Sequence, residues 1–202
     1  MDFNPRRTGK EQREMDQGLV GYSDLTIPER YINAHISLIR DDNAKAILGD
    51  YVKKFSILED SGQGIALFGK PGTGKTYNMA ALAKILTSKG VQVKWAPVVD
   101  MFNKLLDYRD FKRGEAYFKL KNDLKEAQVL MLDDFGQLRD YVRIRETFFE
   151  IVDYRYSWNK PTIFTANFAG DGKLDWKEVA ECFNSSLARR VEDMTKGYVY
   201  IS

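Results

Sequence analysis

The sequence contains one cysteine and one histidine, and each scarcity argues against a class of protein. Cys182 has no second cysteine with which to form an internal disulfide, as is usual for proteins of the reducing cytoplasm. A single histidine, His35, argues against a metal site or catalytic triad built on histidine, and we expect it to be an ordinary surface or helix residue.

Long hydrophobic runs are also missing, because no apolar stretch approaches the about 20 residues that cross a bilayer. Residues 1–18 are polar and charged, so we expect neither a signal peptide nor a membrane anchor, and we expect a cytoplasmic protein. The net charge of +2 is too balanced to indicate a nucleic-acid binder by itself. At 202 residues, the chain is long enough for one domain with a substantial core.

A complete phosphate-loop motif, G-x-x-x-x-G-K-[ST], occupies residues 69–76 (GKPGTGKT). The apolar run 65–68 before it predicts a buried strand, and the spacing of Met79, Leu82 and Leu86 after it predicts a helix. Glycines let such a loop turn tightly, so that its N–H groups and the helix N-terminus can hold a polyphosphate. A plain glycine-rich turn would not account for the lysine and the threonine.

The motif therefore predicts a nucleotide site with defined roles for its side chains. Lys75 is expected to reach the β- and γ-phosphates, and the Thr76 hydroxyl is expected to bind Mg²⁺. The nucleotide-binding residues that the motif predicts are Gly69, Pro71, Gly72, Thr73, Gly74, Lys75 and Thr76.

Two aspartates, Asp133 and Asp134, end the apolar run 129–132 and are expected at the carboxyl edge of a buried strand. Ligands bind at this edge in open α/β sheets. We assign Asp133 to Mg²⁺ and Asp134 to the base or water-positioning role. The alternative is a pair of solvated turn aspartates.

Weaker signals come from an asparagine and two arginines. Asn167 ends the expected strand 162–165 and could orient water or contact the γ-phosphate, but asparagine is also a common turn residue. Arg189 and Arg190 lie on a short helical pattern near the end of the chain. They could stabilise transition-state charge on the nucleotide of a neighbouring subunit, or they could be a solvated basic pair.

Strand and helix patterns alternate along most of the chain, which predicts an α/β fold with a parallel sheet covered on both faces. Asp41 or Asp42 can cap a helix that precedes the first strand. The five expected strands are 65–68, 91–95, 129–132, 162–165 and 198–201. The later helices are expected at 98–106, 143–158, 176–182 and 185–194.

The order of these motifs resembles that of an AAA+ P-loop ATPase. Within that superfamily, residues 25–202 are similar to the DnaC/DnaI-type replicative helicase loaders and to the related IstB-type transposition ATPases. The resemblance implies ATP and Mg²⁺ as cofactors. The segment 27–31 resembles the adenine-side segment, which implies Ile27 and Pro28 at the nucleotide. Residues 165–167 resemble sensor 1, and residues 186–193 resemble the segment of the arginine finger, with Arg190 as the finger.

The sequence departs from the loader pattern in three places. Only residues 1–24 precede the ATPase segment, and we expect them to form an arm that binds a partner or is a tail without function. The chain ends at the last expected strand, so we expect no C-terminal lid. Met194 occupies a position where loaders can carry a further arginine. These departures fit a compact, phage-type version of a loader in a bacterial cytoplasm.

Loaders and initiators have an extra helix after the second strand that is associated with single-stranded DNA, and residues 98–118 occupy that position. Cations such as Arg109 and aromatic rings such as Tyr108 alternate over 108–126. Cations can contact phosphates and rings can stack on bases. Acidic residues dilute the charge, however, and the rings could instead belong to the core.

Three functions are compatible with these observations. The first is a helicase loader that binds a hexameric replicative helicase and single-stranded DNA, and that self-associates because an arginine finger needs a neighbour. The second is a transposition ATPase that binds duplex DNA and a transposase. The third is a small-molecule kinase, which usually needs a mobile arginine-rich lid that the sequence does not suggest.

Overall fold

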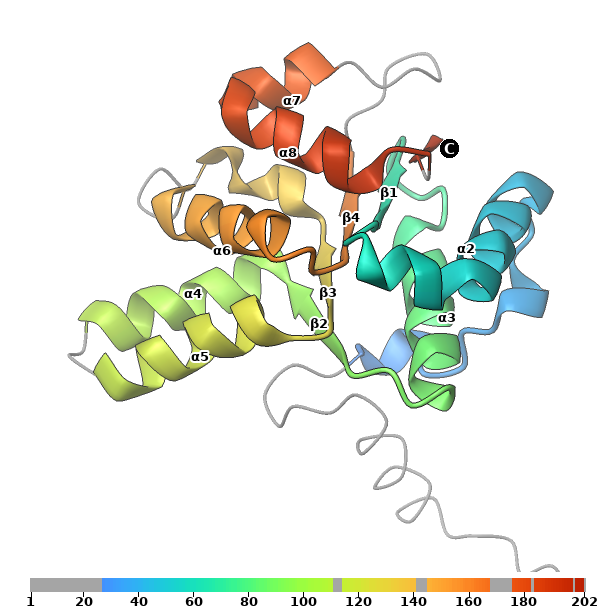
Figure 1. Cartoon of the computed structure of the whole chain (residues 1–202), viewed down its shortest axis with the longest axis horizontal. Helices are drawn as coiled ribbons and strands as arrows, with labels where there is room; N and C mark the ends of the chain where they lie inside the picture. Colours follow the sequence, from blue (N-terminus) through green and yellow to red (C-terminus); the bar gives the residue numbers. More distant parts are fainter. Residues whose placement is uncertain are drawn as a thin grey trace, which may run out of the picture.

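Five parallel strands form the sheet at the centre of the protein (Figure 1). The computed structural model describes residues 27–110, 114–140, 145–167, 176–182, 184–197 and 199–201. The strands are β1 (Ile65–Phe68), β2 (Val93–Pro97), β3 (Val129–Asp133), β4 (Thr162–Ala166) and β5 (Val199–Ile201). Their order across the sheet is β2-β3-β4-β1-β5. The predicted parallel sheet is therefore confirmed.

The register of the central strands explains where the polar motifs meet. Leu132 of β3 lies opposite Phe164 of β4, and Leu67 of β1 lies opposite Thr165 of β4. The three strands therefore end at the same edge, and the residues that follow each strand emerge side by side. All positions of β1 and β4 are buried, as expected for strands that are covered on both faces.

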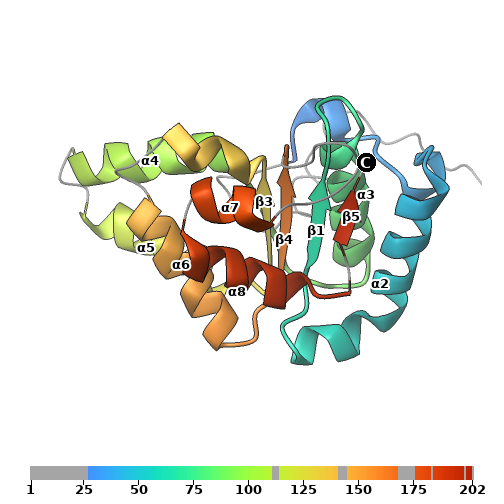
Figure 2. The same cartoon turned by 90° about the horizontal axis from the view of Figure 1, so that it is seen from above.

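Helices cover both faces of the sheet (Figure 2). The helices α2 (Asp42–Asp60) and α3 (Lys75–Ser88) pack on one face. The other face is covered by α4 (Val98–Asp110), α5 (Gly114–Glu126), α6 (Arg145–Ser157), α7 (Trp176–Cys182) and α8 (Ser185–Thr195). Alternate strand residues point to opposite faces: Leu67 joins the core under α2 and α3, whereas Phe68 joins the core under the other helices.

Local sequence signals account for the beginning of α2 and the end of α3. The Asp41 carboxylate accepts a hydrogen bond of 2.8 Å from the backbone N–H of Ala44, so Asp41 is the residue that caps α2. Gly90, with φ of 85°, turns the chain after α3. The N–H of Val91 still donates to Leu86 at the end of that helix. The second strand consequently begins at Val93, two residues later than predicted.

The charged segment 108–126 is largely helical, because α4 runs on to Asp110 and α5 follows it as the second arm of a hairpin. This hairpin extends outward from the edge of the sheet near β2 (Figure 1). Tyr108 and Tyr117 pack partly against the core, whereas Phe118 is 61% exposed. The core alternative therefore applies to the two tyrosines and not to Phe118.

Two other expectations concern the N-terminal arm and membrane-spanning helices, and the structure describes only part of the residues involved. The predicted arm over residues 1–24 lies outside the described residues, as do Phe111, Lys112 and Arg113 of the charged segment. Among the helices that the structure describes, none combines the length and the apolar composition needed to cross a membrane.

Candidate nucleotide-binding site

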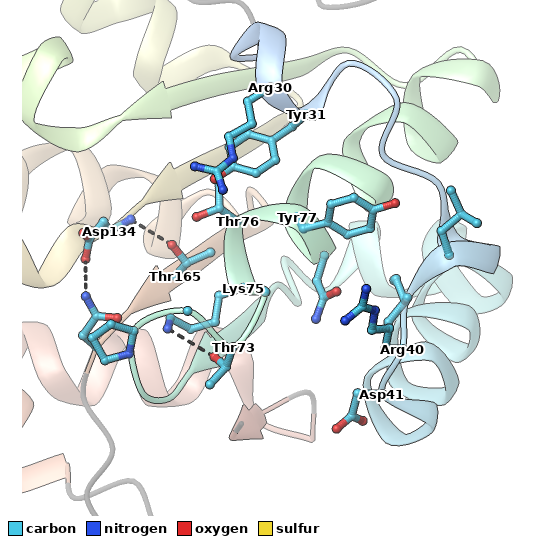
Figure 3. A pocket seen from close by; sticks show the side chains of 17 residues that line it. Arg30, Tyr31, Arg40, Asp41, Thr73, Lys75, Thr76, Tyr77, Asp134 and Thr165 are labelled. Carbon is cyan, nitrogen blue, oxygen red and sulfur yellow. Dashed lines mark hydrogen bonds between the residues drawn. The ribbon is translucent and has the colours of Figure 1, made fainter.

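A cavity of about 1080 Å³ opens at the edge where β1, β3 and β4 end (Figure 3). Ligand pockets commonly have volumes of about 300–1,000 Å³, so a nucleotide-sized molecule fits this one. Its lining residues are Arg30, Tyr31, Leu38, Ile39, Arg40, Asp41, Pro71, Gly72, Thr73, Gly74, Lys75, Thr76, Tyr77, Asn78, Asp134, Thr165 and Asn167. Residues 71–76 of the phosphate loop, the second aspartate and Asn167 thus meet in one cavity.

The phosphate loop owes its shape to glycines with left-handed backbone angles. Gly72 has φ of 83° and Gly74 has φ of 94°, a region that other residues rarely adopt. A Cβ at either position would meet no atom within 4 Å, so the backbone angle and not lack of space requires glycine there. Helix α3 begins directly after Gly74, and its N-terminal N–H groups therefore lie at the cavity.

Lys75 is the buried cation of the phosphate loop. Its Nζ donates to the carbonyl oxygens of Gly69 at 3.1 Å and Lys70 at 2.7 Å, and it lies 3.5 Å from the Thr73 hydroxyl. Burial lowers the pKa of Lys75, while the charges of Asp134 and Asp133 act in the opposite direction. Because a phosphate oxygen carries charge and a carbonyl does not, phosphate would be the stronger acceptor for this ammonium group.

Asp133 receives two hydroxyl hydrogen bonds on one carboxylate oxygen. Thr76 donates to its Oδ1 at 3.0 Å and Thr165 donates to the same atom at 2.6 Å. Burial raises the pKa of Asp133, and the two hydroxyl groups partly offset that effect. Mg²⁺ prefers oxygen ligands and is usually held by one or two carboxylates together with phosphates and water. The adjacent oxygens of Thr76 and Asp133 fit that requirement.

Asp134 and Asn167 are in direct contact, although they follow different strands. The Asn167 Nδ2 donates to Asp134 Oδ1 at 3.3 Å, and Gln137 Nε2 donates to the other oxygen. The backbone of Asp134 is left-handed, with φ of 57°, and its N–H donates to the Thr165 hydroxyl at 2.8 Å. Both polar side chains line the cavity. The ends of β3 and β4 therefore bring these two polar groups together at the cavity.

Two residues assigned to the adenine side, Ile27 and Pro28, do not line the cavity. Ile27 packs against the core under α2 and α3. The Pro28 carbonyl accepts a 2.8 Å hydrogen bond from Tyr31, which begins the short 3-10 helix η1 (Glu29–Tyr31). After this turn, Arg30 and Tyr31 line the cavity, whereas Ile27 and Pro28 do not (Figure 3).

Arg190 lies away from the cavity of its own chain. Its guanidinium forms an ion pair with Asp153 at 2.5 Å and lies over the rings of Phe149 and Tyr156, with 23% of the side chain exposed. Arg189, in contrast, is 76% exposed and pairs only loosely with Asp193, at 3.8 Å. The interpretation as a solvated basic pair therefore suits Arg189 but not Arg190.

Sequence reasoning missed the part of the cavity wall formed by residues 38–41. Asp41 was read only as a helix cap, yet it and Arg40 both line the cavity (Figure 3). Tyr77 was missed as well, although it directly follows the motif, and its hydroxyl accepts a hydrogen bond from the backbone N–H of His35 at 3.3 Å. Only the packing of residues 35–41 against α3 brings these groups together.

The chain is similar to known ATP-binding proteins. A family described as IstB-like ATP binding protein matches residues 41–184. The phage-like element PBSX protein XkdC of Bacillus subtilis is 30% identical over 159 residues, which is 75% of this chain and 55% of that protein. The replicative helicase loader DnaI of Bacillus subtilis is 31% identical over 124 residues, which is 60% of this chain and 38% of the loader. The chain thus spans about half the length of these relatives or less.

Solved structures agree with the fold. The crystal structure of the DnaC helicase loader superposes with a TM-score of 0.72 at 23% identity, covering 85% of this chain and 98% of that one. The crystal structure of DnaI has a TM-score of 0.64 at 27% identity, covering 88% and 90%. These matches confirm the predicted AAA+ fold.

Proposed function

The chain belongs to the family of IstB-like ATP-binding proteins, and on this basis we propose that it is a Mg²⁺-dependent ATPase that loads a replicative DNA helicase. One observation carries the ATPase part of this proposal. Lys75, Thr76, Asp133, Asp134 and Asn167 come from three separate segments and are brought to one edge of the sheet, around one cavity or in direct contact with its lining.

Each of these residues has a chemical role in the proposed reaction. Lys75 and the N–H groups of the phosphate loop hold the phosphates, and Thr76 and Asp133 hold Mg²⁺, which would offset the charge that develops on the phosphates. Asp134 positions the attacking water and accepts its proton. Asn167 keeps that carboxylate in place through its 3.3 Å hydrogen bond.

The loading function rests on the relatives. DnaI of Bacillus subtilis and DnaC of Escherichia coli, which are 31% and 32% identical over the matched parts, are both named replicative helicase loaders. A fold match with DnaA bound to AMPPCP and single-stranded DNA, at a TM-score of 0.67 and 20% identity, supports the fold alone. A hexameric replicative helicase is accordingly the partner that we propose for this chain, in the cytoplasm of a bacterium.

We place the contact with single-stranded DNA on the hairpin of α4 and α5. Phe118 is 61% exposed on α5, and Lys119 beside it is also exposed, so a ring and a cation are both available to solvent. An exposed ring can stack on a base while the cation contacts the neighbouring phosphate.

The proposal also includes self-association, because the arginine finger that we assign to Arg190 would act on the ATP of an adjacent subunit. Arg190 does not line the cavity of its own chain, which supports a role at the cavity of a neighbour. Its ion pair with Asp153 would have to open when it reaches the neighbouring subunit.

The test is ATP hydrolysis together with the mass of the particle, measured by size exclusion with light scattering. Both are measured with and without the hexameric helicase and single-stranded DNA. We expect an ATP-dependent complex with the helicase, and weaker DNA binding when Phe118→Ala is compared with an exposed ring elsewhere, Trp158→Ala. If the chain forms no complex with the helicase but binds duplex DNA in the presence of ATP, it would instead be a transposition ATPase.

A further inference from the structure

Thr165 is a buried residue that contacts both aspartates of the site. It lies on the central strand β4, is 1% exposed, and places its hydroxyl at the edge where β3 ends. The hydroxyl donates to Asp133 Oδ1 at 2.6 Å and accepts from the N–H of Asp134 at 2.8 Å. One oxygen atom thus connects the predicted metal ligand with the backbone of the next residue.

The direction of both hydrogen bonds follows from the chemistry of the groups. A backbone N–H can only donate, so the Thr165 oxygen must accept from Asp134. The hydroxyl has one proton, and that proton is therefore available to Asp133. Hydrogen bonds in such a chain polarise one another, so the bond to the carboxylate gains from the bond to the N–H.

The backbone of β3 explains why a hydroxyl is needed at this place. Asp134 turns out of the strand with φ of 57°, and the paired register between β3 and β4 stops at Leu132 and Phe164. The Asp134 N–H is partly buried, and a fully buried N–H without an acceptor costs about 1–3 kcal/mol, which is the upper bound here. The Thr165 hydroxyl supplies the acceptor, which couples the bend at Asp134 to the orientation of Asp133.

We propose that Thr165 is a positioning residue that holds the Asp133 carboxylate in place for Mg²⁺ and holds the turn that presents Asp134. Thr76 holds the same carboxylate oxygen from helix α3, so the carboxylate is fixed from two separate elements. The inference rests on the proposed function, because it assumes that Mg²⁺ and ATP bind at Thr76 and Asp133.

The experiment measures the affinity of the full chain for a fluorescent ATP analogue over a Mg²⁺ titration, and also in excess chelator. Thr165→Val keeps the shape of the side chain and removes both hydrogen bonds, whereas Thr165→Ser keeps the hydroxyl. The control is Thr162→Val at the other end of β4. It removes a buried hydroxyl that bonds with Arg155 Nε and with the carbonyl of Lys160, away from the cavity.

The Mg²⁺ effect is the ratio of the affinity in Mg²⁺ to the affinity in chelator. We expect this ratio to be about tenfold smaller in Thr165→Val, since changes in residues that orient metal ligands commonly cost about 10–100-fold. The affinity of Thr165→Val for the analogue in chelator should remain within about twofold of that of the wild type. Thr165→Ser should restore the Mg²⁺ effect. Thr162→Val should lower the unfolding midpoint without altering the Mg²⁺ effect.

A Thr165→Val protein with the wild-type Mg²⁺ effect would overturn the inference. If Thr165→Val does not fold, the pair Thr165→Ser and Thr165→Cys answers the same question, because the thiol is of similar size and makes only weak hydrogen bonds. Equal Mg²⁺ effects in that pair would also overturn it. If the wild type itself shows no Mg²⁺ effect, the proposed function fails first, which is a distinct result.

Discussion

The two ends of strands β3 and β4 each hold a buried cation, but they do so in different ways. At the amino end, Arg155 is fully buried and its guanidinium donates to the carbonyl oxygens of Leu124, Lys125, Ala127 and Pro161. It also donates to the Thr162 hydroxyl. At the carboxyl end, Lys75 is 8% exposed, donates to carbonyls of its own loop, and borders an open cavity.

This difference separates a structural cation from one that can bind a ligand. Burial lowers the pKa of Arg155 to about 9, and its partners are fixed parts of several segments, so a ligand would have to break the fold to reach it. The partners of Lys75 belong to the phosphate loop alone. The ammonium can therefore exchange loop carbonyls for phosphate oxygens without disturbing the sheet.

Arg190 gives the most severe test of this comparison, because it is partly enclosed like Arg155 yet is assigned to a ligand. If it acts on the ATP of a neighbouring subunit, Arg190→Ala should lower hydrolysis in the assembled state by about a thousandfold and leave ATP affinity unchanged. Single-turnover hydrolysis and analogue binding on the helicase complex measure these two quantities. Arg189→Ala is the matched control on the same helix.

The ion-pair partner of Arg190 separates the two interpretations. Asp153→Asn releases Arg190 from its 2.5 Å ion pair and keeps the guanidinium. A finger should then retain its effect on hydrolysis. If Arg190 is only a clamp between α6 and α8, Arg190→Ala and Asp153→Asn should both destabilise the fold and leave hydrolysis per folded molecule unchanged.

Arg155→Met should destabilise the protein strongly, because the carbonyls of Leu124, Lys125 and Ala127 lose this donor and that of Pro161 keeps only the N–H of Leu130. We expect a loss of roughly 3–4 kcal/mol in the free energy of unfolding, measured with urea. Arg155→Lys should lose less, since an ammonium replaces some of the donors. ATP affinity of the folded fraction should not change, and a parallel loss of affinity would show that the two ends of the sheet are not independent.

Lys75→Ala should show the opposite pattern. Removing a charge-assisted contact with phosphate costs up to about 3 kcal/mol, so we expect ATP affinity to fall about a hundredfold while the unfolding midpoint changes little. Lys94→Met is the control, because Lys94 is also buried, at 1% exposed, but pairs with Asp123 on α5. Equal losses of affinity in both variants would mean that burial of a lysine, and not its position, determines binding.

Features that depend on neighbouring residues could be predicted from the sequence, whereas features that depend on contacts between distant segments could not. The phosphate loop lies within residues 69–76, and Asp133 and Asp134 directly follow an apolar run, so local spacing sufficed for them. Arg155 lies on the same face of α6 as the apolar residues Phe148 and Ile151, and this spacing could have indicated a buried cation. Its acceptors, however, come from other segments and are known only once the chain is folded.

The same reasoning applies to the adenine side of the cavity. Ile27 and Pro28 were assigned by resemblance, but a single 3-10 turn decides which side chains of that segment face the cavity. Arg40 and Tyr77 meet there because residues 35–41 pack on α3, a contact between segments about 40 positions apart (the His35–Tyr77 hydrogen bond spans 42). The role of Thr165 likewise depends on the register between β3 and β4.

The smallest expected effect is a change in the free energy of unfolding when the Asp133 carboxylate is removed. Burial raises the pKa of Asp133, which means that the fold disfavours its charged form. Asp133→Asn removes that charge and leaves an Oδ1 that can still accept from Thr76 and Thr165. We therefore expect the variant to be more stable than the wild type in chelator, by on the order of 1 kcal/mol, in urea unfolding at neutral pH.

The same variant should lose the gain in ATP affinity that Mg²⁺ provides, because a neutral amide is a poorer ligand for that ion. Higher stability with a lost Mg²⁺ effect would identify Asp133 as a residue kept for binding at the expense of the fold. The matched control is Asp134→Asn, whose carboxylate already accepts from Gln137 and Asn167. If Asp133→Asn is less stable than the wild type, its carboxylate supports the sheet edge as Arg155 supports the other edge, and the contrast between the two ends would no longer hold.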